Sequence, residues 1–175
     1  QFDNNDWKKL NGTVTANSTI SPNGIINADA FIESTSSTGD RALFTDPKTI
    51  SSGQVITLSG YYKSNGRDLR LSCFNSPFSV GFGIYVNLVN GTILSSFSAG
   101  GGIVSSSNIK SLNNDWYYVS ISGTLSTETS ARFTSYLSIG NEVRYQGNGT
   151  SGIYIYGAQL NTGSVAKPYF PTTNR

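Results

Sequence analysis

Aromatic and polar side chains alternate with apolar ones along the strand-like segments of this sequence. Because successive side chains on a strand point to opposite faces, these residues are predicted to lie on faces turned away from the core. The residues are Tyr61, Lys63, Tyr85, Asn87, Trp116, Tyr118, Arg132 and Tyr136. Aromatic rings can stack on the apolar C–H face of a sugar, while amide, hydroxyl and cationic groups replace the water lost from its hydroxyls. The set is therefore a candidate carbohydrate-binding face, with Trp116 near its centre.

Two other interpretations fit the same residues. Aromatic side chains also cover a second layer of core or a subunit interface when another element packs on a sandwich strand. They can also be plain surface, because much of any protein surface is apolar. The residue types alone leave all three interpretations open.

Catalytic chemistry has little support in the composition. The chain has no histidine and one cysteine, Cys73, so Ser–His and Cys–His pairs, the usual zinc sites and an internal disulfide are all absent. Cys73 lies in the strand-like run 69–74, where a buried and inert thiol is expected. Glycoside hydrolysis needs two carboxylates on either side of the bond, and no Asp or Glu lies among the aromatic alternates. We expect no catalytic residues and no enzyme.

Four carboxylates lie near predicted strand ends, at Asp3, Asp6, Asp29 and Glu33. A structural Ca²⁺ would need about six to eight oxygen ligands, which such loops can supply together with backbone carbonyls. Solvated loop carboxylates are the favoured interpretation. No cofactor and no metal ligand is assigned.

The length and charge of the chain limit its organisation and its partners. With 175 residues it has the size of a single domain with a substantial core, and we expect one domain over residues 1–175. Charged residues make up 13% and the net charge is +2, which predicts no nucleic-acid partner. No apolar run approaches the roughly 20 residues of a membrane helix, so membrane insertion is not expected.

Short strands and tight turns dominate the pattern. The clearest strand is 55–63, in which Ile56, Leu58 and Tyr62 share the predicted core face. No segment has helical periodicity with caps. About nine to eleven strands, with turn signals roughly every ten residues, predict an all-β antiparallel β-sandwich of the jelly-roll type.

The later strands can be assigned faces in the same way. Alternation predicts that Trp116 and Tyr118 face outward, and that Arg132 and Tyr136 do so on the next strand. The predicted core positions are Tyr117, Val119, Ile121, Phe133, Leu137, Ile139, Tyr154, Tyr156, Ala158 and Leu160. Trp7, in a polar setting near the N-terminus, is expected to plug the edge of the core, with a binding role as the alternative.

The most specific pattern is GIYIYGAQLNTGSVAKPYFPTT, at 152–173. It resembles the closing signature of jelly-roll domains that recur in bacteriophage tail fibres, tailspikes and other virion proteins, which are related in shape to carbohydrate-binding modules. That signature has an aromatic residue, Gly-Ala-Gln-Leu-Glu, a glycine turn and Tyr-Ile-Pro-Thr-Thr. Asn161 replaces its glutamate here. Further similar motifs occur in the same order upstream, at 2–7, 22–29, 87–93, 113–118 and 145–149.

This resemblance implies a function that the fold class alone does not. It implies a non-catalytic receptor-binding module of a phage tail fibre or tailspike, located in the virion or outside the cell, which recognises bacterial surface polysaccharide or another glycan. Such domains often form homotrimers within larger virion proteins, where avidity raises weak affinity. The alternatives are a structural virion module for capsid decoration or fibre trimerisation, and a carbohydrate-binding module of a secreted bacterial enzyme.

Overall fold

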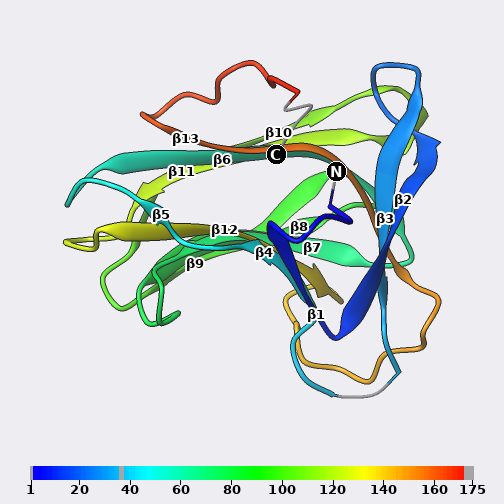
Figure 1. The fold of residues 1–175 in the computed structure, drawn as a ribbon, viewed down its shortest axis with the longest axis horizontal. Coiled ribbons are helices and arrows are strands. Elements are labelled where there is room, and N and C mark those ends of the chain that lie inside the picture. The colour runs from blue at the N-terminus through cyan, green and yellow to red at the C-terminus, as the bar shows by residue number, and fades with distance from the viewer. Residues whose placement is uncertain (1, 36–37, 172–175) are drawn as a thin grey trace.

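Two antiparallel β-sheets packed face to face make up the computed structural model of this protein, which describes residues 2–35 and 38–171 (Figure 1). Sheet A has the order β1-β4-β12-β7-β8-β9, with β5 paired to β12. Its strands are β1 Trp7–Leu10, β4 Ala42–Thr45, β5 Lys48–Thr49, β7 Asp68–Phe74, β8 Gly81–Asn87, β9 Thr92–Ala99 and β12 Ser130–Ser138.

Sheet B has the order β10-β11-β6-β13-β3-β2. Its strands are β2 Gly12–Ile20, β3 Ile26–Glu33, β6 Val55–Asn65, β10 Ile103–Ser111, β11 Tyr117–Thr124 and β13 Gly152–Thr162. The helical content of the described residues is one 3₁₀ turn, Asn113–Asp115. No helix there is long and apolar enough to cross a membrane.

The antiparallel β-sandwich predicted from the sequence is confirmed. The described residues form thirteen strands instead of nine to eleven, because β1 and β5 are too short to show a recognisable alternation. The chain crosses between the sheets repeatedly, for example from β6 to β7 and from β9 to β10. Strands that are neighbours in a sheet are therefore often distant in sequence. In particular, β6 lies between β11 and β13.

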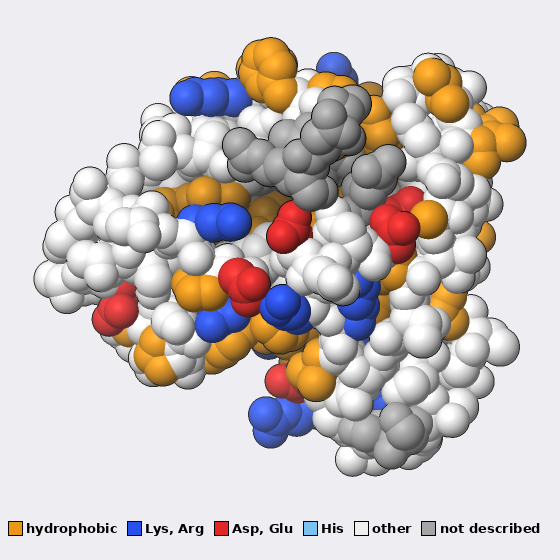
Figure 2. Space-filling view, in the orientation of Figure 1, with side chains coloured by type: hydrophobic (Ala, Val, Ile, Leu, Met, Phe, Trp, Pro, Cys, Tyr) orange, Lys and Arg blue, Asp and Glu red, His pale blue; other side chains and the backbone are white. Residues whose placement is uncertain are grey.

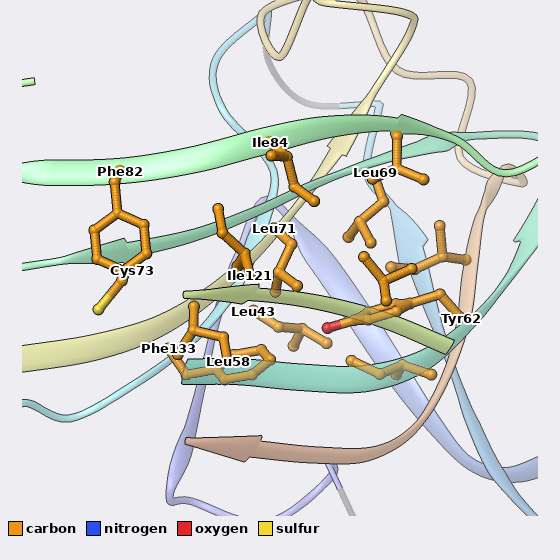
Figure 3. Packing of buried hydrophobic residues seen from close by; sticks show 14 of the residues in the cluster. Leu43, Leu58, Tyr62, Leu69, Leu71, Cys73, Phe82, Ile84, Ile121 and Phe133 are labelled. Atoms are coloured by element: carbon orange, nitrogen blue, oxygen red, sulfur yellow. The ribbon is translucent and has the colours of Figure 1, made fainter. Parts of the chain in front are cut away.

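The core fills the space between the two sheets (Figure 3). The inward positions predicted on β6 and β11 are confirmed, and their partners across the core come mainly from β7, β8 and β12. The central residues of this cluster are Leu43, Leu58, Tyr62, Leu69, Leu71, Cys73, Phe82, Ile84, Ile121 and Phe133. Tyr62 places its hydroxyl 2.9 Å from Ser135 Oγ of the opposite sheet, so its one polar atom is hydrogen-bonded within the core.

The closing strand β13 changes face at Gly157. The pairing with β6 shifts between Tyr156 and Gln159, and Gly157 has φ +60°, a conformation that glycine adopts without the steric cost of a Cβ. An extra residue in a strand reverses which side chains face the core. Consequently Tyr156 faces outward, whereas Ala158, after the bulge, packs against the core.

This bulge makes part of the predicted closing face wrong. Ile153 and Ile155 are the buried core residues of the first half of β13, and Tyr154 and Tyr156 point away from them. The expectation for Ala158 and Leu160 is confirmed. Ile139 also differs from the prediction. It is 50% exposed, because β12 ends at Ser138 and the chain turns there.

Candidate functional site

The eight predicted ligand-binding residues do not form one face. Tyr61, Lys63 and Tyr118 belong to sheet B, whereas Tyr85, Asn87, Arg132 and Tyr136 belong to sheet A. Because the core lies between the sheets, the outward sides of these two groups face opposite directions. Trp116 lies immediately before β11 and is buried.

On sheet B, four tyrosines form a continuous row, which we call the tyrosine strip: Tyr118, Tyr61, Tyr156 and Tyr169. The register places Tyr61 opposite both Tyr118 and Tyr156. Ring centroids are 5.0 Å apart for Tyr118 and Tyr61, 5.8 Å for Tyr61 and Tyr156, and 5.4 Å for Tyr156 and Tyr169. All four rings are partly exposed. The strip therefore offers consecutive aromatic surfaces to a ligand.

The strip depends on the bulge in β13. A Cβ at Gly157 would lie 3.1 Å from the Tyr61 ring and 3.3 Å from the Tyr169 ring, so glycine leaves the space that lets both rings approach. The hydroxyl of Tyr156 accepts a hydrogen bond from Asn23 Nδ2 at 2.9 Å. Burial raises the pKa of Tyr61, and the neighbouring tyrosines raise it further. Its hydroxyl is therefore neutral near pH 7 and can both donate and accept.

The tyrosine strip leads into a cleft of about 690 Å³ between the two sheets. Tyr156 and Tyr169 belong both to the tyrosine strip and to the lining of the cleft. The aromatic lining is Phe2, Trp7, Phe133, Tyr156, Tyr169 and Phe170, and the polar lining includes Asn4, Asp6, Asn23, Asn27, Lys48 and Gln159. Acidic and basic side chains are interspersed on the face viewed in Figure 2. The cleft thus combines rings with hydrogen-bonding groups and has no single sign of charge.

The aromatic wall of the cleft is fixed by contacts near the N-terminus. The ring of Trp7 lies 4.7 Å from Phe2 and 5.5 Å from Phe133, edge-on to the latter. The backbone N–H of Phe2 donates to Asp29 Oδ2 at 2.6 Å. Trp7 is partly exposed and contacts the core while lining the cleft. It meets the edge-plug expectation, while its binding role stays a prediction.

Asn27, which lines the cleft, carries a side-chain oxygen in an unusual setting. Asn27 Oδ1 is buried and makes no hydrogen bond to the described residues. Buried amide oxygens are normally hydrogen-bonded, because an unmet acceptor costs free energy. The surface that Asn27 offers to a ligand in the cleft therefore excludes this buried oxygen.

The tail that carries Tyr169 and Phe170 is held by side chains of β13. Asn161 donates from Nδ2 to the carbonyl of Val165 at 3.1 Å and accepts from the N–H of Lys167 at 3.2 Å. Gln159 donates to the Lys167 carbonyl at 3.2 Å. Asn161, which departs from the motif, is thus a clamp for the tail. The Thr172-Thr173 end of the motif lies outside the described residues.

Three predicted ligand-binding residues make structural contacts. Trp116 is 2% exposed, and its indole N–H donates to the Ile20 carbonyl at 3.1 Å. Trp116 is not part of the core cluster between the sheets, but its burial rules it out as an open surface for a ligand, because the end of β2 at Ile20 contacts it. Lys63 Nζ donates to the Asn114 carbonyl at 2.8 Å. Asn87 Oδ1 accepts from two backbone N–H groups of the β8–β9 turn.

On sheet A, Tyr85 and Tyr136 flank Arg70, whereas Arg132 lies four residues from Tyr136 along β12. The guanidinium of Arg70 lies 3.6 Å from the Tyr136 ring centroid. Tyr136 is only 6% exposed. Its ring therefore packs under the Arg70 guanidinium and offers little surface to a ligand. Arg70 is absent from the sequence prediction, because nothing in the alternation of β7 indicates the rings that neighbouring strands bring to it.

The favoured interpretation of the four strand-end carboxylates as solvated is wrong for Asp29 and Glu33, which are buried at 1% and 2% exposure. Asp29 accepts backbone N–H groups of Phe2 and Asn17. Glu33 accepts from Arg67 at both oxygens, and also from the Tyr145 hydroxyl and the Asn148 N–H. Asp3 and Asp6 are exposed. Within residues 2–35 and 38–171, no three His, Cys, Asp or Glu residues gather as metal ligands.

Glu33 has an unusual electrostatic setting. Its side chain is fully buried, and burial by itself raises the pKa of a carboxyl group. The hydrogen bonds from Arg67, the Asn148 N–H and Tyr145 outweigh this effect and hold the pKa of Glu33 below its usual value. The charged carboxylate is therefore a structural anchor and not a proton donor at neutral pH.

Comparison with known proteins gives a likeness of fold. Neither a protein-family model nor a curated protein sequence matches the chain. The structure of the enzymatically active domain of tailspike protein 4 from bacteriophage CBA120 is similar, with a TM-score of 0.51 and 12% sequence identity over 93% of this chain. This chain spans 20% of that tailspike chain.

A looser likeness is to xylanase 10B of Clostridium thermocellum, whose CBM22-1 and GH10 modules were solved with xylohexaose. Its TM-score is 0.49 at 15% identity, covering 98% of this chain and 28% of that one.

Proposed function

We propose that this protein is a non-catalytic glycan-binding module, and that it binds an oligosaccharide along the tyrosine strip and in the adjoining cleft. The observation that carries the proposal is the continuity of the strip with the cleft through Tyr156 and Tyr169. Neutral sugars are recognised by stacking on rings and by hydrogen bonds from amides and hydroxyls. Both kinds of group line this surface.

The shape of the site favours an extended ligand. Three successive ring contacts, from Tyr118 to Tyr169, form a row. A chain of sugar rings can place successive apolar faces on such a row, while Asn23, Asn27 and Gln159 meet hydroxyls in the cleft. A single small ligand would use only part of this surface.

The small number of carboxylates in the cleft lining supports the proposed non-catalytic role. Asp6 is the one acidic residue among the described residues that line the cleft. Glycoside hydrolysis needs an acid and a second carboxylate across the bond. Binding without turnover therefore fits the lining better than hydrolysis does.

We further propose that the module belongs to a virion or another extracellular protein and acts in attachment to bacterial surface polysaccharide. The ordered motifs that resemble those of phage tail-fibre domains support this, and the tailspike likeness adds an instance of the fold in a phage protein. A homotrimer is expected on the same resemblance. The role in attachment depends on whether the ligand is a bacterial surface polysaccharide.

Titration calorimetry of the purified protein against neutral oligosaccharides, chosen from a screen of bacterial polysaccharides, tests the proposal. Tyr61→Ala and Tyr156→Ala should each weaken binding about tenfold, equivalent to about 1.4 kcal/mol of lost stacking. Tyr85→Ala is the matched control, since it removes a half-exposed tyrosine from the other sheet. It should leave the affinity for neutral sugar unchanged.

Two results would contradict the proposal. One is the absence of binding to every neutral glycan at millimolar concentration. The other is binding that Tyr61→Ala and Tyr85→Ala weaken equally. Release of reducing ends from the bound glycan would refute the non-catalytic assignment.

A structural virion module is the second candidate, and one surface feature favours it. Three isoleucines are exposed at the β2–β3 hairpin, where Figure 2 shows hydrophobic side chains gathered: Ile20 is 52%, Ile25 61% and Ile26 61% exposed. Clustered exposed apolar residues are typical of protein interfaces. Analytical ultracentrifugation should then show self-association that Ile25→Ser with Ile26→Ser abolishes. A monomer at all concentrations would count against this candidate.

A further inference from the structure

A second group of rings surrounds an arginine on the outward side of sheet A. The register pairs Arg70 of β7 with both Tyr85 of β8 and Tyr136 of β12. On β9, Phe97 lies opposite Gly83. We use the name arginine face for the surface formed by Arg70, Tyr85, Phe97, Tyr136 and Arg132.

Glycines of β8 let aromatic rings lie directly on the sheet. A Cβ at Gly81 would overlap the ring of Phe74, and a Cβ at Gly83 would overlap that of Phe97. These two rings are stacked, with 28° between their planes and 5.9 Å between centroids. The arginine face therefore has an aromatic floor over β8.

Arg70 lies among these rings. Its guanidinium carbon is 3.6 Å from the Tyr136 centroid and 5.2 Å from that of Phe97. Phe74 and Tyr85 follow at 5.7 and 5.9 Å. Cation–π contacts of this kind hold a guanidinium without neutralising it. Arg70 Nε is buried and has no hydrogen-bond partner in the described part of the chain.

No carboxylate neutralises this charge among residues 2–35 and 38–171. The ion pairs there use other cations, namely Lys8, Arg67 and Arg144. Asp40, whose charge acts on Tyr136, is itself held by Arg144 at 3.0 Å. Arg70 is partly exposed, so it presents a positive charge to solvent from an aromatic surround.

Arg132 repeats the arrangement on the same side of the sheet. Its guanidinium lies 5.0 Å from the Phe78 ring, and its Nη1 donates to the Thr45 carbonyl at 3.3 Å. Its Nε also lacks a partner in the described residues. The register of β12 with β7 sets the two arginines four residues apart along the strands, about 13 Å.

A guanidinium and a carboxylate form paired, parallel hydrogen bonds, and the planar geometry makes arginine selective for such groups. The neighbouring aromatic floor suits the C–H face of a sugar. A sugar acid offers both features on one ring. We propose that the arginine face binds a polysaccharide with carboxylate-bearing sugars, at a site separate from the cleft.

Calorimetry with an oligosaccharide of uronic acids and with its carboxyl-reduced, neutral form tests this directly. The wild-type protein should bind the acid form at least about tenfold more tightly. Arg70→Gln and Arg132→Gln should each abolish that preference, and Arg70→Lys should retain only part of it, since lysine keeps the charge without the planar fork. Lys110→Gln, an equal loss of charge on exposed β10, should have no effect. Raising the salt concentration should weaken the acid form selectively.

This proposal and the proposed function can fail separately. Tyr61→Ala should weaken the neutral ligand and spare the preference for the acid form. The proposal is overturned if Arg70→Gln and Arg132→Gln keep the wild-type preference while circular dichroism shows that both variants are folded. It is also overturned if no carboxylated oligosaccharide binds at millimolar concentration. It is equally overturned if a single-stranded oligonucleotide binds this face more tightly than the uronate, or if Arg70→Gln abolishes self-association. If Arg70→Gln does not fold, the preference for the acid form is measured in Arg132→Gln and Tyr85→Ala instead, and an unchanged preference in both overturns the proposal.

Discussion

Arg67 donates to both carboxylate oxygens of Glu33, from Nη2 to Oε1 at 2.6 Å and from Nε to Oε2 at 2.8 Å. The pair links β3 of sheet B to the connection between β6 and β7, and it also accepts the Tyr145 hydroxyl. It therefore joins segments that are distant in sequence. Removing one partner would leave the other charge buried.

Glu33→Gln should destabilise the protein by about 3 kcal/mol at neutral pH, because it leaves Arg67 without its counterion. The folded-state pKa of Glu33 is lowered, so its contribution is complete above the unfolded pKa of about 4.3 and is lost as pH falls through the folded pKa. Urea denaturation at several pH values should show this acid dependence in wild type and a weaker one in Glu33→Gln.

The matched control for this variant is Asp46→Asn, because Asp46 forms an exposed ion pair with Lys8 at 3.4 Å. Such pairs contribute about 0–1 kcal/mol. Equal destabilisation by the two variants would contradict the anchoring role of Glu33.

Gly157→Ala should lower both stability and glycan affinity. The substitution strains a residue at φ +60° and crowds the rings of Tyr61 and Tyr169. Gly140→Ala is the matched control, because Gly140 has φ +58° and open space around its missing Cβ. We expect each to cost about 1 kcal/mol of backbone strain, and only Gly157→Ala to weaken binding. Thermal denaturation and calorimetry check the two effects, and equal affinities would oppose the role of the bulge.

The two tryptophans should behave differently when a glycan binds. Trp7 lines the cleft, whereas Trp116 is buried and hydrogen-bonded to Ile20. Ligand binding should change the fluorescence of Trp116→Phe but not that of Trp7→Phe. Trp116→Ala should instead cost about 3–5 kcal/mol of stability through the cavity it leaves. A fluorescence response that is lost only in Trp116→Phe would restore the sequence-based assignment of Trp116 to the binding face.

Cys73 should be unreactive in the folded protein. Burial raises the pKa of its thiol to about 12, so almost no thiolate is present near neutral pH. A thiol reagent at about pH 8 should label the native protein only as fast as it unfolds, and should label it at once in denaturant. Rapid labelling of the folded state would show that the strand run 69–74 is accessible.

The sequence alone was sufficient for the fold class and for most core positions. The alternation of Ile56, Leu58 and Tyr62 is a local property of the chain, and so is that of Tyr117, Val119 and Ile121. A strand exposes this period of two wherever it lies in a sheet. The buried state of Cys73 followed from the same local pattern.

The candidate site could be predicted only in part. Tyr61 and Tyr118 were found because each alternates with core residues on its own strand. Tyr156 was missed because the bulge at Gly157 changes the face of β13, although a glycine inside a strand pattern is a signal for such a bulge. The burial of Trp116 was missed because it depends on Ile20 at the end of β2, a segment that is distant in sequence.

What only the tertiary structure decided is which strands are neighbours. Tyr61 contacts Tyr118 and Tyr156 because β6 lies between β11 and β13, and Arg70 meets Tyr136 because β7 pairs with β12. Strand order depends on contacts between distant segments that bury a common core, and local alternation carries no information about them. The sequence therefore determined the outward faces of regular strands such as β6, while the bulge in β13 and the pairing of strands decided the tyrosine strip, its cleft and the separate arginine face.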